Sequence, residues 1–159
     1  SRRLGTYIQT SKRNLIMVKA VLIDLDRTFW NFDSWAGNEK TLQQLQLGLY
    51  PESLECIDLL KKKGYLVGFA SASYKKELCE KYIHMLFPPK YLDFVYIEAT
   101  YPSKKNHFNY VSTKFDVEFG DMILIDDLKA ILNDAVKNGL NIVDVSTTGI
   151  SKEKIKHLL

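Results

Sequence analysis

The sequence predicts an α/β fold, a three-layer open parallel sheet of about five strands in a Rossmann-like arrangement. Two observations lead to this prediction. Short runs of β-branched and other apolar residues alternate along the chain with segments that have helical periodicity. The runs are apolar throughout, which is typical of strands buried on both faces of a parallel sheet. Strands and helices in this order form right-handed βαβ units, with helices covering both faces of the sheet.

The elements follow one another from residue 18 to the end of the chain. We expect strands at 18–23, 65–70, 94–97, 122–125 and 140–145. Helices are expected at about 51–63, 74–86, 104–115 and 129–138, with a short one at the end of the chain. The first of these helices has the clearest limits. Pro51 suits a first helical turn, and three lysines followed by Gly64 provide a cationic end and a glycine stop.

Length and composition indicate one globular domain. The chain has 159 residues, of which 46% are hydrophobic and 26% charged. No apolar run approaches the ~20 residues of a membrane span, so we expect a soluble, cytoplasmic protein with no membrane partner. Residues 1–16 hold four basic residues and no acidic one. We expect this segment to be a flexible basic arm, or to lie upstream of a natural start at Met17, with 17–159 as the folded domain.

Polar residues stand where the predicted strands end. Asp24 follows the first strand, Ser71 the second and the pair Asp126-Asp127 the fourth, while Lys104 lies after the third. The carboxyl ends of parallel strands meet at one edge of the sheet, where ligands bind. These side chains are therefore expected to line one pocket.

The residue types in this pocket suit phosphoryl transfer. Asp24 and Asp26 lie two apart after a strand, so one carboxylate can attack while the other holds or delivers a proton. A carboxylate-rich oxygen site fits Mg²⁺ better than zinc, and the three histidines are scattered. Ser71 and Lys104 add a hydroxyl donor and a cation, which stabilise the oxygens of a transferring phosphoryl group.

The ordered segments DLDRTFWNF, LYPES, GFASAS, SKKNHF and ILIDD span about residues 18–150. Together they resemble the haloacid dehalogenase (HAD) superfamily, and within it the capless magnesium-dependent phosphatases. The resemblance implies phosphomonoester hydrolysis with Mg²⁺ as cofactor. Asp24 would be the nucleophile that forms an aspartyl-phosphate. Asp26 would act first as general acid and then as general base, with its backbone carbonyl on the metal.

The resemblance also assigns the remaining site residues. Ser71 would donate a hydrogen bond to the phosphoryl oxygens, and Lys104 would neutralise the phosphate and steady Asp24. Asp127 would bind Mg²⁺ directly, with Asp126 either on the metal or just behind it. Lys105 is the rival of Lys104 for the role of the site cation, because the two are adjacent.

The sequence departs from the family pattern at two positions. Ala72 stands where the family tends to carry Arg, so a phosphate or substrate contact is lost and specificity could differ. Ile131 stands where a polar residue tends to support the metal site, and Asn133 or Asp134 would have to replace it.

Residues 27–49 are expected to form a flap over an open active site, because no part of the chain is long enough for a cap domain. Trp30, Phe32 and Trp35 in this flap either stack on a leaving group or pack onto the domain. An open site fits a small phosphate ester or a phosphoprotein, with phosphotyrosine or a sugar phosphate as the substrate. The sequence does not indicate an oligomeric state.

Two other classes of function were weighed against a phosphatase. A receiver-type signalling domain uses similar residues, but it carries its paired acids on the first strand, its phospho-acceptor on the third and its Lys on the fifth, whereas here the pair follows the fourth. A catalytically weak HAD-like module would bind nucleic acid or protein through the basic arm. Four positive charges without a patterned aromatic partner are weak grounds for a nucleic-acid ligand.

Overall fold

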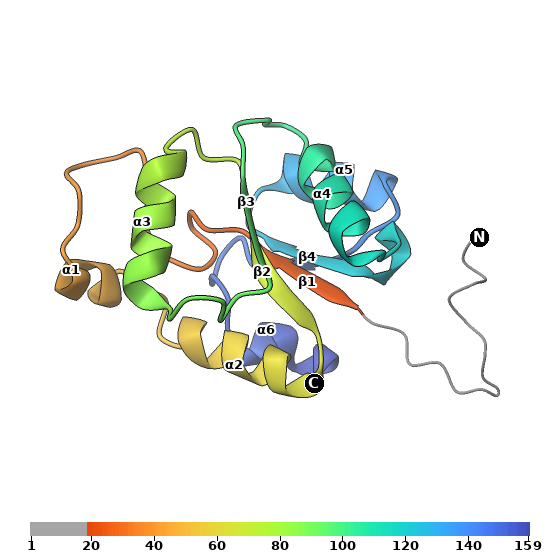
Figure 1. Ribbon diagram of the computed structural model, residues 1–159, viewed down its shortest axis with the longest axis horizontal. Helices are drawn as coiled ribbons and strands as arrows, with labels where there is room; N and C mark the ends of the chain where they lie inside the picture. The colour runs from red at the N-terminus through yellow and green to blue at the C-terminus, as the bar shows by residue number, and fades with distance from the viewer. Residues whose placement is uncertain (1–18) are drawn as a thin grey trace.

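The computed structural model describes residues 19–159, which form a five-stranded, all-parallel sheet in the order β3-β2-β1-β4-β5 (Figure 1). The strands are β1 (Ala20–Ile23), β2 (Leu66–Ser71), β3 (Phe94–Ile97), β4 (Met122–Asp126) and β5 (Asn141–Asp144). The α/β fold class predicted from the sequence is therefore confirmed. The predicted basic arm, residues 1–16, lies outside the described residues.

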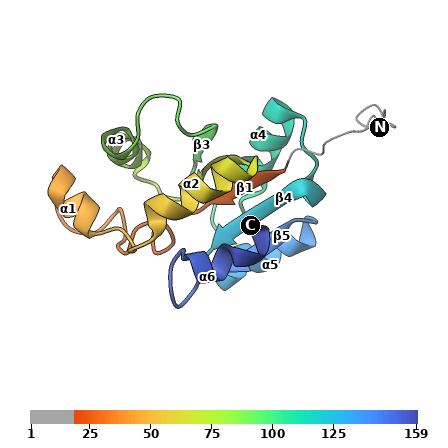
Figure 2. The ribbon, with the colours of Figure 1, turned by 90° about the horizontal axis from the view of Figure 1, so that it is seen from below.

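Helices cover both faces of the sheet (Figures 1 and 2). One face packs against α2 (Ser53–Lys63), α3 (Lys76–Leu86) and the short α6 (Lys152–Ile155), which is followed by η3 (Lys156–Leu158). The other face packs against α4 (Lys105–Phe115) and α5 (Lys129–Lys137). One turn of 3-10 helix, η2 (Phe119–Asp121), leads into β4.

The alternation of side chains along β1 divides the core into two layers. Val21 and Ile23 belong to the cluster under α2 and α3, whereas Ala20 and Leu22 belong to the cluster under α4 and α5. All four are completely buried, because β1 is the central strand. This burial explains why the strand is apolar throughout, and it makes Asp24 the first charged residue as the chain leaves the core.

The predicted limits of α2 are close to the observed ones. The helix ends at Lys63, and Gly64 follows with φ 105°, a left-handed conformation that glycine adopts without steric cost. The strands β2 and β4 each run one residue further than expected. Ser71 and Asp126 are consequently the last residues of their strands, which fixes their backbones in the sheet.

The segment 27–49 contains a helix that the periodicity did not predict. The helix α1 (Leu42–Leu47) begins with a capping box between Thr41 and Gln44 and packs beside α3 (Figure 1). Six residues are too few to give a readable helical period. Between residues 19 and 159 no insertion forms a large cap domain. In the same range, no helix has the length and apolar character needed to cross a bilayer.

Candidate active site

The predicted site residues gather at the carboxyl edge of the sheet, between β1 and its neighbours β2 and β4. From β1 the chain continues to β2 on one side, whereas β4 pairs with β1 on the other side. A crevice therefore opens at this switch point. The structure brings together all six residues expected from the sequence, which are Asp24, Asp26, Ser71, Lys104, Asp126 and Asp127.

Lys104 lies beneath the cluster and not in the cleft. Its side chain is 1% exposed, and Nζ donates hydrogen bonds to Asp24 Oδ1 (2.9 Å), Asp126 Oδ2 (2.7 Å) and the carbonyl oxygen of Ala70 (2.6 Å). An ammonium group has three N–H donors, and all three are used. Lys104 therefore holds the carboxylate of Asp24 from below, while Lys105 is exposed on α4.

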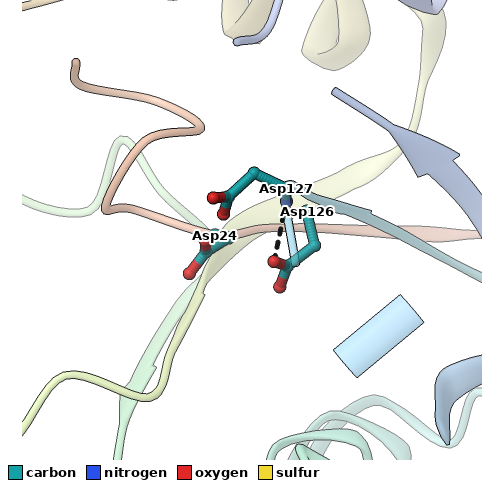
Figure 3. A group of neighbouring side chains, drawn as sticks. All are labelled: Asp24, Asp126 and Asp127. Atoms are coloured by element: carbon teal, nitrogen blue, oxygen red, sulfur yellow. Dashed lines mark hydrogen bonds between the residues drawn. The ribbon is translucent and has the colours of Figure 1, made fainter. Parts of the chain in front are cut away.

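Three carboxylates converge above this lysine. Single oxygens of Asp24, Asp126 and Asp127 lie within 4.8 Å of one another (Figure 3). Burial raises the pKa of Asp24 to about 7 and that of Asp126 to about 6, although Lys104 lowers both. Burial alone would lower the pKa of Lys104, but Asp126 and Asp24 outweigh it and the pKa is raised. One ammonium for three carboxylates leaves two negative charges uncompensated when all three carboxylates are ionised.

The two adjacent aspartates of β4 differ in what their oxygens can still bind. Asp126 is completely buried, and its Oδ1 accepts the backbone N–H groups of Asp127 (2.8 Å; Figure 3) and Leu128 (3.1 Å), while Oδ2 faces Lys104. Asp127 is half-buried and lines the cleft. Asp127 is therefore the carboxylate with oxygens available to a ligand, whereas Asp126 is committed to the protein.

Thr28 belongs to the site, although sequence reasoning gave it no role. Its Oγ1 lies 3.2 Å from both Asp24 Oδ2 and Asp127 Oδ1, and its single proton can serve one of them at a time. Arg27 has φ 60°, and this left-handed turn returns Thr28 towards the end of β1. The only sequence signal was the position of the threonine within DLDRT.

Asp26 is held by two donors, one on each carboxylate oxygen. Trp30 Nε1 donates to Oδ1 (2.8 Å) and Ser34 Oγ donates to Oδ2 (2.9 Å). Burial raises the pKa of Asp26, and these two hydrogen bonds lower it. Trp30 is completely buried and stacks on Phe32 with 5.0 Å between ring centroids. Of the three flap aromatics, Trp35 alone lies at the cleft.

Ser71 is buried at the end of β2. Its Oγ accepts the backbone N–H of Ser73 (3.1 Å), so its own proton can be offered to an oxygen in the cleft. Its carbonyl accepts hydrogen bonds from the backbone N–H of Glu98 (3.0 Å) and from His107 Nε2 (2.6 Å). Burial lowers the pKa of His107 to about 4, so the imidazole is neutral. In the sequence this histidine belongs to the segment SKKNHF and is one of three scattered histidines that do not suggest a zinc site.

The departures from the family pattern are visible in space. Ala72 lines the cleft without a polar group, and Ile131 is buried in the core under α5. Asp134 does not reach the cluster, because it accepts a hydrogen bond from Ser103 Oγ (2.6 Å) and so supports the turn before Lys104. Asn133 is exposed on α5.

The site opens into a cleft of about 230 Å³. Its floor is polar, with Asp24, Asp26, Ser71 and Asp127 among the lining residues. Its mouth is lined by large and exposed apolar or aromatic side chains, which are Trp35 (53% exposed), Tyr74 (66%), Tyr101 (61%) and Leu128 (45%). A small charged group can reach the floor while a larger apolar group stays at the mouth.

This fold, with its carboxylates at the ends of β1 and β4, defines a member of the HAD superfamily, as the motifs predicted. A model of the Acid Phosphatase family matches residues 16–159, and the chain therefore belongs to that family. No curated protein sequence matches the chain significantly. Its assignment to the capless magnesium-dependent phosphatases stays a prediction.

Solved structures share the fold. The chain is similar to the N-terminal part of a Bacteroides fragilis protein that contains a phosphatase domain complexed with Mg (TM-score 0.62, 18% identity). The matched region covers 89% of this chain and 39% of the Bacteroides fragilis chain. The chain is also similar to a HAD phosphatase from Thermococcus onnurineus (TM-score 0.60, 17% identity), covering 84% of this chain and 89% of that one. A third is a haloacid dehalogenase-like hydrolase from Streptococcus pneumoniae (TM-score 0.61, 11% identity; 88% and 90%).

Proposed function

We propose that this protein is a Mg²⁺-dependent phosphomonoester hydrolase that works through an aspartyl-phosphate on Asp24. The observation that carries the proposal is the setting of this carboxylate. It lies at the floor of the cleft, is held from below by Lys104 and shares the cleft with Ser71, Asp26 and Asp127. This arrangement supports the assignment of a nucleophile, a proton carrier and a donor for the phosphoryl oxygens to these residues.

The residues present fit a magnesium ion. Oxygen ligands suit a hard divalent cation, and the three clustered carboxylates, when ionised, carry two more negative charges than Lys104 compensates. Asp24, Asp127 and the backbone carbonyl of Asp26 would hold the ion. When bound, Mg²⁺ would neutralise phosphoryl charge and favour the ionised, nucleophilic form of Asp24.

In the first step, a carboxylate oxygen of Asp24 attacks phosphorus, and the bond between phosphorus and the leaving-group oxygen breaks. Asp26 gives its proton to that oxygen, so the alcohol leaves neutral. Ser71 donates its hydroxyl proton to a phosphoryl oxygen in a hydrogen bond, and Lys104 keeps the attacking carboxylate in place.

In the second step, water attacks the phosphorus of the aspartyl-phosphate. Asp26, now ionised, takes a proton from this water. The bond between Asp24 and phosphorus breaks, which releases inorganic phosphate and restores both aspartates. The sum is hydrolysis of one phosphate monoester to an alcohol and phosphate.

The mouth of the cleft supports a flat leaving group over a sugar. Trp35, Tyr74 and Tyr101 come from three separate loops and expose ring surface around the polar floor of the cleft. Phosphotyrosine, free or on a protein surface, is therefore the substrate we propose. Arg27 and Asp33 also line the cleft, but these two charged side chains are paired with each other at 3.1 Å.

The test is hydrolysis of p-nitrophenyl phosphate and phosphotyrosine by the full chain, with Mg²⁺ and with EDTA. We expect turnover to require the metal and to be lost in Asp24→Asn. Asp58→Asn is the matched control. Asp58 is an exposed carboxylate on α2 that pairs with Tyr91 and Lys62, and it is not among the residues that line the cleft. Robust turnover in EDTA, or full activity of Asp24→Asn, would contradict the proposal.

A further inference from the structure

Two serines outside the predicted set form hydrogen bonds that lead to Asp26, and one of them, Ser73, also lines the cleft. Ser34 and Ser73 are 5% and 8% exposed, and their Oγ atoms lie 2.7 Å apart. Ser34 comes from the segment 27–49, whereas Ser73 follows β2. The buried thiol of Cys79 on α3 lies beside both hydroxyls; burial raises its pKa, and the hydrogen bonds with the two hydroxyls lower it.

When Asp26 is ionised, the hydrogen bonds around these serines have a single possible direction from donor to acceptor. The carboxylate has no proton to give, so Ser34 must donate to Asp26 Oδ2 (2.9 Å). Ser34 has then used its proton and must accept from Ser73. Ser73 Oγ in turn accepts the backbone N–H of Lys75 (3.0 Å). The chain of donors therefore starts at the turn before α3 and ends on Asp26.

The same serine also reaches the phosphate-binding residue. The backbone N–H of Ser73 donates to Ser71 Oγ (3.1 Å), while its side chain serves Asp26 through Ser34. A displacement of Ser73 would move both residues. The segment 27–49 is also tied to α3 by the Lys81–Glu39 ion pair and by Lys40 N–H on the Tyr82 hydroxyl (2.9 Å). Unlike these two contacts, the serine contact leads both to Asp26 and to the end of β2.

We infer that Ser34 and Ser73 form a hydroxyl relay that positions Asp26 for proton transfer and couples the segment 27–49 to the phosphate-binding end of β2. The inference rests on the proposed function, since it assigns the two serines to the proton carrier of that reaction. Both are positioning residues. Trp30 fixes one oxygen of Asp26, and the relay fixes the other.

Dependence on the leaving group separates this role from a merely structural one. An alkoxide needs the proton of Asp26 in order to leave, whereas p-nitrophenolate leaves without it. Misplacing the proton carrier should therefore damage hydrolysis of an alkyl phosphate far more than hydrolysis of p-nitrophenyl phosphate. Loss of general structure would reduce both to the same degree. The quantity to compare is kcat/KM, which reports the steps up to departure of the leaving group.

We would measure kcat/KM with Mg²⁺ for glycerol phosphate and p-nitrophenyl phosphate in Ser34→Ala, Ser73→Ala and the double variant. For Ser34→Ala we expect a loss of about tenfold to a hundredfold with glycerol phosphate and about threefold or less with p-nitrophenyl phosphate. The double variant should lose little more than Ser34→Ala, because the two hydroxyls act in series. Ser34→Thr, which keeps a hydroxyl, should restore most of the selective loss.

Ser53→Ala is the matched control, because Ser53 is completely buried and donates to the Phe29 carbonyl (2.6 Å) outside the cleft. It should change the two substrates equally. Equal losses in Ser34→Ala, or losses that simply multiply in the double variant, would overturn the relay. An inactive wild type would instead contradict the proposed function. The relay would then be tested by the unfolding midpoints, where the decrease in the double variant must be smaller than the sum of the decreases in the two single variants.

Discussion

His107 should make the folded state lose stability as the solution becomes acidic. Its Nε2–H donates to the Ser71 carbonyl, and its Nδ1 is buried with no hydrogen-bond partner among residues 19–159. A second proton would have to enter on Nδ1, in a place that offers it neither water nor an acceptor. Burial accordingly lowers the pKa of His107 from 6.5 to about 4.

The direction and size of the effect follow from linkage. Between pH 6.5 and 4 the unfolded histidine binds a proton that the folded one refuses, so the free energy of unfolding falls as pH falls through this window. The whole shift corresponds to about 3 kcal/mol, of which about 2 kcal/mol is lost between pH 7.5 and 5. The raised pKa values of Asp24 and Asp126 have the opposite effect on stability. These carboxyl groups bind protons more tightly in the folded state, so their contribution to the free energy of unfolding falls as pH rises.

A difference between two proteins removes the contribution of the carboxyl groups. Glutamine at position 107 can still donate to the Ser71 carbonyl but does not titrate. Urea unfolding of wild type and His107→Gln, measured without metal from pH 7.5 to 5, should show the wild type losing about 2 kcal/mol relative to the variant. His84→Gln, at an exposed histidine of α3, is the control: it keeps His107 and should retain the pH dependence of the wild type. A difference that stays constant with pH would refute the reasoning.

Two further predictions concern the acidic cluster. Lys104→Met should destabilise the fold by about 3–5 kcal/mol, because it leaves Asp24 and Asp126 buried without their cation. The control Lys105→Met should leave the free energy of unfolding almost unchanged. Chemical unfolding of both variants tests this prediction, and equal effects would show that the buried ion pairs contribute little to stability. Asp127→Asn should weaken Mg²⁺ binding in calorimetric titration by about tenfold or more and leave the unfolding midpoint nearly unchanged. Asp126→Asn should mainly lower the unfolding midpoint, because Asp126 is hydrogen-bonded within the protein. The reverse pattern would show that Asp126 is the metal ligand and Asp127 the structural residue.

The parts of the site that the sequence could predict are those fixed by strands. A continuous apolar run identifies a buried strand, and the rule that parallel strands end at one edge then places Asp24, Ser71 and Asp126 together. The choice between Lys104 and Lys105 needed the structure, because α4 begins between them and sends only the first side chain under the cluster. One position in the chain decides between a buried group and a solvated one.

The contacts that the sequence could not predict lie in loops. Ser34 reaches Asp26 only because the segment 27–49 turns back on itself, through Arg27 at φ 60° and the pairing of Trp30 with Leu49. No period or spacing encodes such a path. His107 was equally hidden, because its partner is a backbone carbonyl on β2, and a main-chain atom leaves no signature in the sequence.

The start of α4 joins the two halves of the cleft mechanically. Lys104, which immediately precedes this helix, binds the carboxylate of Asp24 after β1, and His107, one turn later, binds the main chain of β2 at Ser71. Any sliding of the helix along its axis would drag both anchors by the same amount. The spacing between the Asp24 carboxylate and Ser71 is thus set by one helical turn, and a perturbation on the outer surface of α4 would change that spacing directly.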